Sequence, residues 1–307
     1  MSRPVIALTG GTGFIGQYVL RALTARGYRL RALLRRPTML PMECASAVVG
    51  DLARPQNMSA ALAGVDAVIH SAALSATMSG VPEDDHRVLD TEATVRLARA
   101  AERAGVRRFI FLSAIRAQSG PAADRVLTED LEPKPTDAYG RSKLAAERGL
   151  AELAGDWVAL RLALVYGAGV KGNIAWLMRL ARSPYPLPLG GLTSRRSLLS
   201  LENLLAALEC VLAAPDPLRR PLIVADPQAL TIPEMIAAMR RGLGRRPHLI
   251  RVPDAVLKLA FDAVRRPDIY LRVSGDLVAD PAALARLGWV PPVSTAQGLE
   301  RLMRDHS

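Results

Sequence analysis

The chain has 307 residues, of which half are apolar and 22% are charged, so it can bury a large core and is not a disordered protein. Its net charge is +11, and all but four of its 40 basic residues are arginines. These arginines are scattered, with pairs as the longest runs, so we interpret most of them as a solvated surface and expect no nucleic-acid partner. Aromatic residues make up only 4% of the chain, which leaves no obvious platform for stacking bases.

The cysteine spacing and the lack of long apolar segments indicate the compartment and the metal content that we expect. The two cysteines, Cys44 and Cys210, are far apart and have no CxxC or histidine spacing around them. We therefore expect no disulfide framework and no metal site, as is typical of the reducing cytoplasm. Apolar segments stay well short of the ~20 residues that span a bilayer, and no signal peptide precedes the first strand, so we expect a cytoplasmic protein without a membrane partner.

In chain order, the first 165 residues alternate strand-like and helix-like segments. Strands are expected at 5–9, 29–34, 47–49, 67–70, 108–112 and 158–164, and helices at 14–25, 56–63, 85–104 and 138–153. Repeated short β–α–β crossings predict an α/β fold with a doubly wound parallel sheet of the Rossmann type. Ligands of such a sheet bind at the carboxyl ends of its strands.

The second half of the chain has a different composition. Residues 167–197 are rich in Gly, Pro and Arg, and the stretch 183–191 has too many turn residues for regular structure. A helix at 201–212 and a buried strand at 222–225 follow, and then small helices at 231–243, 254–264 and 281–287. We predict a dinucleotide-binding core of residues 1–165, to which 198–226 return. Residues 166–197 and 227–307 would form a small substrate-binding cap.

A glycine-rich turn joins the first strand to the first helix. The sequence from Thr9 to Gly16 reads TGGTGFIG, and its glycines suit a tight turn, a close approach to pyrophosphate and tight helix–strand packing. The helix N-terminus offers unpaired N–H groups to phosphates. The residues expected to bind a dinucleotide here are Gly10, Thr12, Gly13, Phe14, Ile15 and Gly16.

The end of the second strand favours NADP(H) over NAD(H). An NAD site usually has a carboxylate there for the ribose 2′-hydroxyl, but this chain has Arg35 and Arg36. A guanidinium binds a 2′-phosphate through paired hydrogen bonds, so we assign Arg35 to that group.

Further cofactor contacts are expected after the next two strands. Asp51 and Leu52 follow the third strand, where they would border the adenine. The small residues Ala72 and Ala73 follow the fourth strand and would let the backbone approach the cofactor. We interpret His70 beside them as structural.

Tyr139 and Lys143 are four residues apart at the start of a predicted helix and therefore share one face. A free tyrosine has a pKa near 10, which a neighbouring ammonium lowers toward the range useful for proton transfer. The pair therefore predicts a tyrosine acid/base that moves a substrate proton while hydride moves to or from a nicotinamide.

With these motifs the chain resembles an extended short-chain dehydrogenase/reductase of the nucleotide-sugar epimerase/dehydratase family. The resemblance covers nearly the whole chain and rests on residues 9–16, 51–52, 70–73, 139–143, 161, 165–167 and 195–199. The segments 169–173 and 186–197 most resemble bacterial UDP-N-acetylhexosamine 4-epimerases and 4-ketoreductases.

The resemblance implies roles for individual residues. Tyr139 would be the acid/base, Lys143 would also bind the nicotinamide ribose, and Tyr166 would border the nicotinamide. Asn173 and Arg196 would bind the sugar diphosphate, and the segment 186–190, with Leu187, would clasp the nucleobase. Helices equivalent to 85–104 and 138–153 pair across a two-fold axis in the family, which implies a homodimer.

Two positions depart from the family pattern. Ala114 occupies the usual position of a Ser or Thr that bonds the reacting oxygen, and Ser113 substitutes as a catalytic residue only if the backbone turns there. Asp90 occupies the place of an asparagine.

Three functions stay open on this evidence. The first is an NADP(H)-dependent oxidoreductase acting at C4 of a UDP-linked sugar, and the alternative with the same machinery is an NAD(P)-dependent UDP-sugar 4-epimerase. The third, from another class, is a non-catalytic NADP(H)-binding sensor or accessory subunit.

Overall fold

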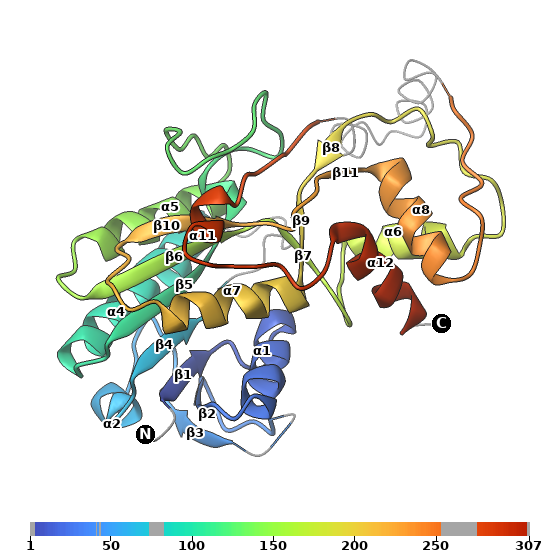
Figure 1. Cartoon of the computed structure of the whole chain (residues 1–307). Helices are drawn as coiled ribbons and strands as arrows, with labels where there is room; N and C mark the ends of the chain where they lie inside the picture. The colour runs from blue at the N-terminus through green and yellow to red at the C-terminus, as the bar shows by residue number, and fades with distance from the viewer. Residues whose placement is uncertain (1–3, 41, 43, 74–82, 253–274, 306–307) are drawn as a thin grey trace.

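The computed structural model describes residues 4–40, 42, 44–73, 83–252 and 275–305. Seven parallel strands form one sheet in the order β10-β6-β5-β4-β1-β2-β3 (Figure 1). The strands are β1 (Val5–Thr9), β2 (Arg29–Leu34), β3 (Ala45–Val48), β4 (Ala67–His70), β5 (Arg108–Ala114), β6 (Asp156–Leu162) and β10 (Arg220–Val224). The predicted doubly wound sheet is confirmed. Its strand order reverses between β1 and β4, which is the position where such sheets bind ligands.

Helices cover both faces of the sheet. One face carries α1 (Phe14–Ala25) and α7 (Leu201–Ala213), and the other carries α2 (Met58–Leu62), α4 (Ala93–Arg103) and α5 (Ala138–Ala151). Alternate residues of β1 face opposite layers of helices. Ile6 and Leu8 pack toward α1 and α7, whereas Ala7 packs toward α2 and α4. Strands covered on both faces must be apolar throughout, which explains the continuous apolar runs in the sequence.

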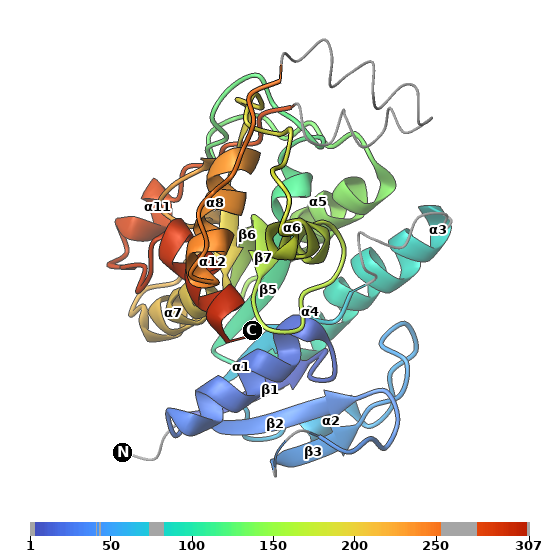
Figure 2. The ribbon, with the colours of Figure 1, turned by 90° about the vertical axis from the view of Figure 1, so that its right-hand side faces the viewer.

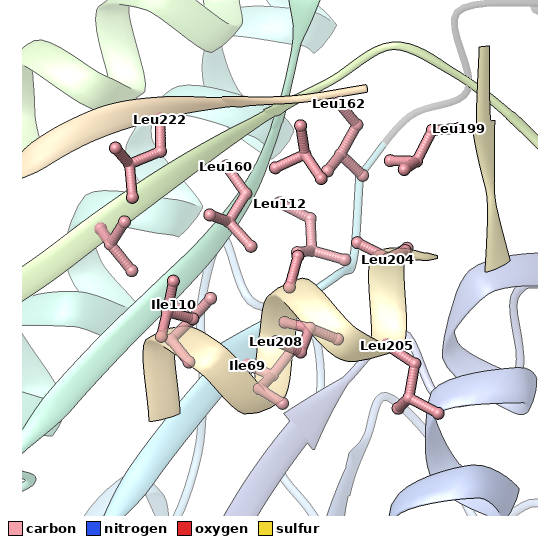
Figure 3. Close-up of a cluster of buried hydrophobic side chains, with 14 of the residues drawn as sticks. Ile69, Ile110, Leu112, Leu160, Leu162, Leu199, Leu204, Leu205, Leu208 and Leu222 are labelled. Carbon is pink, nitrogen blue, oxygen red and sulfur yellow. The ribbon is translucent and has the colours of Figure 1, made fainter. Parts of the chain in front are cut away.

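Leucine and isoleucine side chains fix α7 on the sheet. Figure 3 shows Ile110 and Leu160 of the central strands meeting Leu204 and Leu208 of α7, with all four side chains fully buried. Each such burial contributes about 1.5–3 kcal/mol. This contact packs α7 on the sheet, and the pairing of β10 with β6 adds the last strand to it.

A second apolar cluster lies in the C-terminal half, where α6 (Asn173–Arg182), α8 (Ile232–Gly242) and α12 (Thr295–Arg304) gather (Figure 2). Capping boxes begin α8 at Thr231 and α12 at Ser294. Two small sheets join this part to the rest: β7 (Leu164–Tyr166) pairs with β9 (Leu198–Ser200), and β8 (Arg195–Arg196) pairs with β11 (Leu230–Thr231).

Several predicted elements were wrong in extent. The helix α6, whose buried apolar residues have helical spacing (Ile174, Leu177, Met178 and Ala181), was not predicted. The helix α12 was not predicted. The helix expected at 85–104 is divided into α3 (Glu83–His86), a π-helical segment η1 (Arg87–Glu92) and α4. The helix expected at 254–264 lies outside the described residues.

Other boundaries differ by a few residues. The strand expected at 158–164 is two strands, β6 and β7, and the helix expected at 281–287 is the single turn α11 (Ala282–Ala285). Within the described ranges, no helix is both long enough and apolar enough to cross a bilayer.

Candidate active site

The glycine turn packs too tightly for side chains. Gly10 has φ +70°, and a Cβ on it would lie 2.7 Å from the backbone nitrogen of Ala72, while a Cβ on Gly16 would lie 2.0 Å from the carbonyl oxygen of Gly10. The helix α1 begins at Phe14 without a side-chain cap on its N-cap residue Gly13. An uncapped helix N-terminus at the carboxyl end of β1 fits a pyrophosphate.

A buried chain of hydrogen bonds supports this turn. The Thr9 hydroxyl lies 2.7 Å from Nδ1 of His70 and accepts a bond from the Ala72 N–H, and Nε2 of His70 lies 2.9 Å from the Thr94 hydroxyl. Burial, and to a smaller extent the Lys143 ammonium, lower the pKa of His70 to about 3. His70 is therefore neutral at pH 7 and structural, as the sequence analysis predicts.

The remaining predicted cofactor residues border the same edge of the sheet. Arg35 is exposed just past the end of β2, and no ion pair engages it within the described ranges. Asp51 is also exposed, and one of its carboxylate oxygens accepts a bond from the Ala53 N–H. Leu52 and Ala72 are half-buried, and Ala73 is exposed.

Tyr139 and Lys143 lie in the first two turns of α5, which begins after the N-cap Asp137. The Lys143 ammonium is 5.7 Å from the centroid of the Tyr139 ring and 4.6 Å from that of Phe111. Its Nζ lies 3.4 Å from the carbonyl oxygen of Leu112, so the ammonium sits over the carboxyl end of β5. The structure therefore brings the two predicted side chains together at the ligand-binding edge.

Burial dominates the electrostatics of this pair. It lowers the pKa of Lys143 to about 8, against the opposing effects of the Asp90 and Glu147 carboxylates. It also raises the pKa of Tyr139 well above 10, with a further increase from Asp90 and a decrease from Arg116. The lowering of the tyrosine pKa that the sequence leads us to expect is not found, because desolvation of the phenolate outweighs the effect of the Arg116 cation. Tyr139 is thus protonated at neutral pH.

Ser113 lies beside this pair with its hydroxyl engaged. It shares a face of β5 with Phe111, over whose ring Lys143 lies, and its hydroxyl donates a 2.5 Å hydrogen bond to Glu147 of α5. Glu147 also forms a buried ion pair with Arg161, with Nη2 and Oε2 2.6 Å apart. The catalytic role of Ser113 stays a prediction.

Tyr166 and Leu187 have partners within the protein. The Tyr166 side chain is buried, and its hydroxyl donates to Asp226 at 2.9 Å. The Leu187 side chain is buried in the C-terminal apolar cluster. Its N–H donates to the His248 carbonyl, and its own carbonyl accepts from the Ile250 N–H. Their contacts with the nicotinamide and the nucleobase stay predictions.

Arg196 is the most distinctive of the predicted substrate residues. Its Nη1 lies 3.3 Å from the Pro121 carbonyl oxygen, but its Nε and Nη2 are buried and have no hydrogen-bond partner among the described residues. Burial and the nearby Arg116 lower the pKa of Arg196. Asn173 is exposed at the first position of α6.

The structure adds residues that the sequence did not assign to the site. Arg116 follows β5 directly and forms an ion pair with Asp137. His86 lies edge-on to the Tyr139 ring, with centroids 6.1 Å apart, and Glu147 lies one turn beyond Lys143 on α5. The sequence could have indicated Glu147, because it follows Tyr139 by eight residues and therefore lies on the same face of the helix. In the part of the chain described, no group of three or more candidate ligands could hold a metal ion.

Known proteins resemble this chain over most of its length. The model of the NAD dependent epimerase/dehydratase family matches residues 6–224. The UDP-glucose 4-epimerase of Vibrio cholerae is 31% identical over 306 residues, covering 96% of this chain and 93% of that protein. The ceramide reductase of Caulobacter vibrioides is 31% identical over 82% of this chain and 75% of its own length.

A solved structure extends the likeness to three dimensions. The structure of MoeE5 in complex with UDP-glucose and NAD is 27% identical, has a TM-score of 0.72, and covers 98% of this chain and 99% of its own.

Proposed function

The chain belongs to the NAD dependent epimerase/dehydratase family, and from that premise we propose that it interconverts the C4 epimers of a UDP-linked sugar. The observation that carries the proposal is the pairing of half-buried Tyr139 with buried Lys143, at the edge of the sheet where the glycine turn opens α1. The name of the Vibrio cholerae relative favours this epimerase over the reductase that the sequence analysis put first.

Each part of the site has a chemical task in this proposal. A nicotinamide dinucleotide held here would supply reversible hydride transfer at C4. The N–H groups of the glycine turn and α1 would hold its pyrophosphate. Tyr139, deprotonated when the reaction starts, would take the proton of the C4 hydroxyl as the ketone forms and would give it back as the ketone is reduced, so protons and electrons balance. Lys143, as an ammonium, would stabilise the phenolate before the proton is taken and after it is returned.

Arg196 supports a sugar nucleotide as the substrate. Two of its guanidinium nitrogens are buried without partners among the described residues. A buried donor without an acceptor costs about 1–3 kcal/mol. The phosphate oxygens of a sugar nucleotide would provide the acceptors, with Asn173 as a further contact.

A second candidate is an NADP(H)-dependent reductase of a UDP-linked 4-keto sugar. Exposed Arg35 after β2 favours it, because a guanidinium there suits the 2′-phosphate of NADPH. The relative from Caulobacter vibrioides, whose name specifies a reductase, also favours it.

The test is direct conversion of UDP-sugars. The protein is incubated with NAD⁺ or NADP⁺ and with UDP-glucose, UDP-N-acetylglucosamine or UDP-glucuronic acid, and C4 epimers are identified by NMR. We expect epimerisation of at least one of them, and a loss of about 10²–10⁴-fold in Tyr139→Phe with dinucleotide binding retained.

Other outcomes would replace the proposal. Oxidation of NADPH by a UDP-4-keto sugar, without any C4 interconversion, would establish the reductase. Tight dinucleotide binding with identical, background-level rates in wild type and Tyr139→Phe would establish a non-catalytic binding protein.

A further inference from the structure

A basic pocket lies where α6 and α8 end, and none of its residues belongs to the candidate active site. It has a volume of about 340 Å³ and lies between the residues that follow α6 and those at the end of α8 and just beyond it. Its lining residues are Ser183, Pro184, Arg240, Arg245, Arg246 and His248. Three of them are arginines and none is acidic, so the pocket presents positive charge without a carboxylate to compensate it.

Arg240 is the buried arginine of this pocket, and it fixes the shape of the walls. Its Nη1 donates to the carbonyl oxygens of Pro247 and His248, and its Nη2 donates to those of Ser183 and Tyr185, at distances of 2.6–3.2 Å. The side chain therefore ties the segment after α6 to the segment after α8. Its Nε is also buried and has no hydrogen-bond partner among the described residues.

The other two arginines of the pocket are exposed. Arg245 donates one hydrogen bond, from Nη1 to the Arg182 carbonyl oxygen at 2.6 Å. No ion pair or side-chain hydrogen bond engages Arg246 in the parts of the chain that the structure describes. Burial lowers the pKa of Arg240, and the nearby Arg245 cation lowers it further, so like charges are close together here.

His248 has an unusual backbone conformation at the edge of the pocket. Its φ is +43°, in the left-handed region that residues other than glycine seldom adopt. Its carbonyl accepts hydrogen bonds from Arg240 and from the Leu187 N–H, which hold the backbone in place. Strained residues of this kind cluster at binding and catalytic sites.

Stabilisation of the helix ends explains only part of this charge. Arg240 and Arg245 bond carbonyl oxygens next to the C-terminal ends of α6 and α8, where cations are favourable. Arg246 bonds none of the described carbonyls, and it adds a further positive charge to a pocket without acids. A cleft lined by one sign of charge concentrates ions of the opposite sign.

We infer that this pocket is a second anion site, which binds a phosphate monoester through the guanidinium groups of Arg245 and Arg246 beside the His248 ring. Guanidinium forks match the oxygens of a phosphate, and a monoester carries nearly two negative charges to compensate them. The Ser183 hydroxyl accepts a bond from the Tyr185 N–H and still has its own proton to donate. The volume lies at the lower end of the range for ligand pockets, which suits a small phosphorylated molecule. The inference is independent of the proposed function.

The test uses the small number of histidines. Because the chain has only four, histidine labelled with ¹³C at Cε1 gives few NMR signals, and His248→Gln assigns the one at the pocket. We expect glycerol 3-phosphate to move the His248 signal saturably at constant pH. In Arg246→Ala its binding should weaken about tenfold, the equivalent of one charged hydrogen-bonding contact, and in Arg246→Lys by less.

A second arm distinguishes a soluble phosphate from a lipid headgroup. The protein is sedimented with vesicles of phosphatidylcholine and phosphatidic acid. Saturation by glycerol 3-phosphate without sedimentation would identify a soluble phosphate ester as the ligand. Sedimentation that is lost in Arg246→Ala would identify a headgroup.

Arg241→Ala is the matched control, because it removes the same charge from the residue next to Arg240. The Arg241 guanidinium bonds Glu300 at 2.7 Å and does not line the pocket, so both readouts should stay as in wild type. The inference is overturned if glycerol 3-phosphate leaves the His248 signal unmoved and the vesicles do not sediment the protein. It is also overturned if Arg241→Ala weakens binding as much as Arg246→Ala, since the effect would then be one of net charge.

Discussion

Arg35 is the residue that we expect to decide between the two dinucleotides. It lies just past the carboxyl end of β2, next to β1 and its glycine turn, and its exposed guanidinium would be available to a 2′-phosphate. We predict that Arg35→Ala weakens NADP⁺ binding about tenfold, the equivalent of one charged hydrogen-bonding contact, and leaves NAD⁺ binding unchanged.

Titration of each dinucleotide by calorimetry checks this prediction. Arg36→Ala is the control, since Arg36 is equally exposed and adjacent in the sequence. Equal losses for NADP⁺ and NAD⁺ in Arg35→Ala would contradict a 2′-phosphate contact, and so would an equal loss in Arg36→Ala.

Single residues were predicted well where the signal was their own type, and less well where it depended on a distant partner. Gly10 and Gly16 are required by contacts that no side chain fits, and this followed from the sequence. Ser113 was assigned to the site from its type, but its hydroxyl bonds Glu147 of α5, a partner that the sequence does not indicate.

At the scale of elements, α5 carries a stripe of Tyr139, Lys143 and Glu147, spaced four residues apart. Glu147 is held to β6 by its buried ion pair with Arg161. Removing one partner of a buried ion pair leaves an uncompensated charge. We predict that Arg161→Met lowers the free energy of unfolding by about 3–5 kcal/mol.

Urea denaturation measures this loss. In the double variant Arg161→Met with Glu147→Gln, the loss should be smaller than the sum of the two single losses, because no charge stays buried alone. Arg99→Met is the control: its exposed partner Glu152 lies 3.5 Å away, and we expect a change below about 1 kcal/mol. A loss of unfolding free energy below about 1 kcal/mol in Arg161→Met would contradict the prediction.

Elements with continuous apolar runs were predicted with correct limits, as β1, β2, β4 and α1 show. The long helix at 85–104 was predicted as one piece, because its apolar spacing is helical throughout. Its π-helical interruption depends on hydrogen bonds to α5 and β4, which lie far away in the sequence.

At the scale of the whole molecule, one buried network ties the sheet to the C-terminal part. Asp226, just after β10, accepts bonds from the Tyr166 hydroxyl, the Ser200 N–H and the Asn203 amide, and Tyr166 also donates to the Thr295 carbonyl of α12. Burial raises the pKa of Asp226 to about 6, against the effect of these donors. Because the folded-state pKa lies above the unfolded one, the contribution of Asp226 to stability is greatest below about pH 4 and is lost as the pH rises through 6.

Removing the Tyr166 hydroxyl should therefore matter most when Asp226 is ionised. We predict that Tyr166→Phe lowers the free energy of unfolding by about 1.5–3 kcal/mol at pH 7.5, and by less at pH 5. Urea denaturation at both pH values measures the difference. Tyr185→Phe, at an exposed tyrosine, should change stability by less than about 0.5 kcal/mol. Equal losses at the two pH values in Tyr166→Phe would mean that the ionised carboxylate is not its partner.

The predicted division into a core and a substrate cap, and the homodimer through the helices at 85–104 and 138–153, remain predictions. The groove between α4 and α5 is lined by charged side chains, among them Arg96, Arg99 and Arg148.

The sequence by itself determined the parallel sheet, the phosphate-binding turn and the Tyr139–Lys143 pair. Each of these features depends on residues that are close together in the sequence: apolar runs, glycines at fixed intervals, and two side chains one helical turn apart. Local spacing is enough for them, because backbone geometry alone fixes their relation.

Only the tertiary structure decided what surrounds that pair. The effect of the Asp90 carboxylate on Tyr139, the approach of Arg116 to Arg196, the partner of Ser113 and the burial of Tyr166 all join segments distant in the sequence. Burial also reversed the expected direction of the pKa of Tyr139, because the cost of removing a charge from water depends on the packing around it.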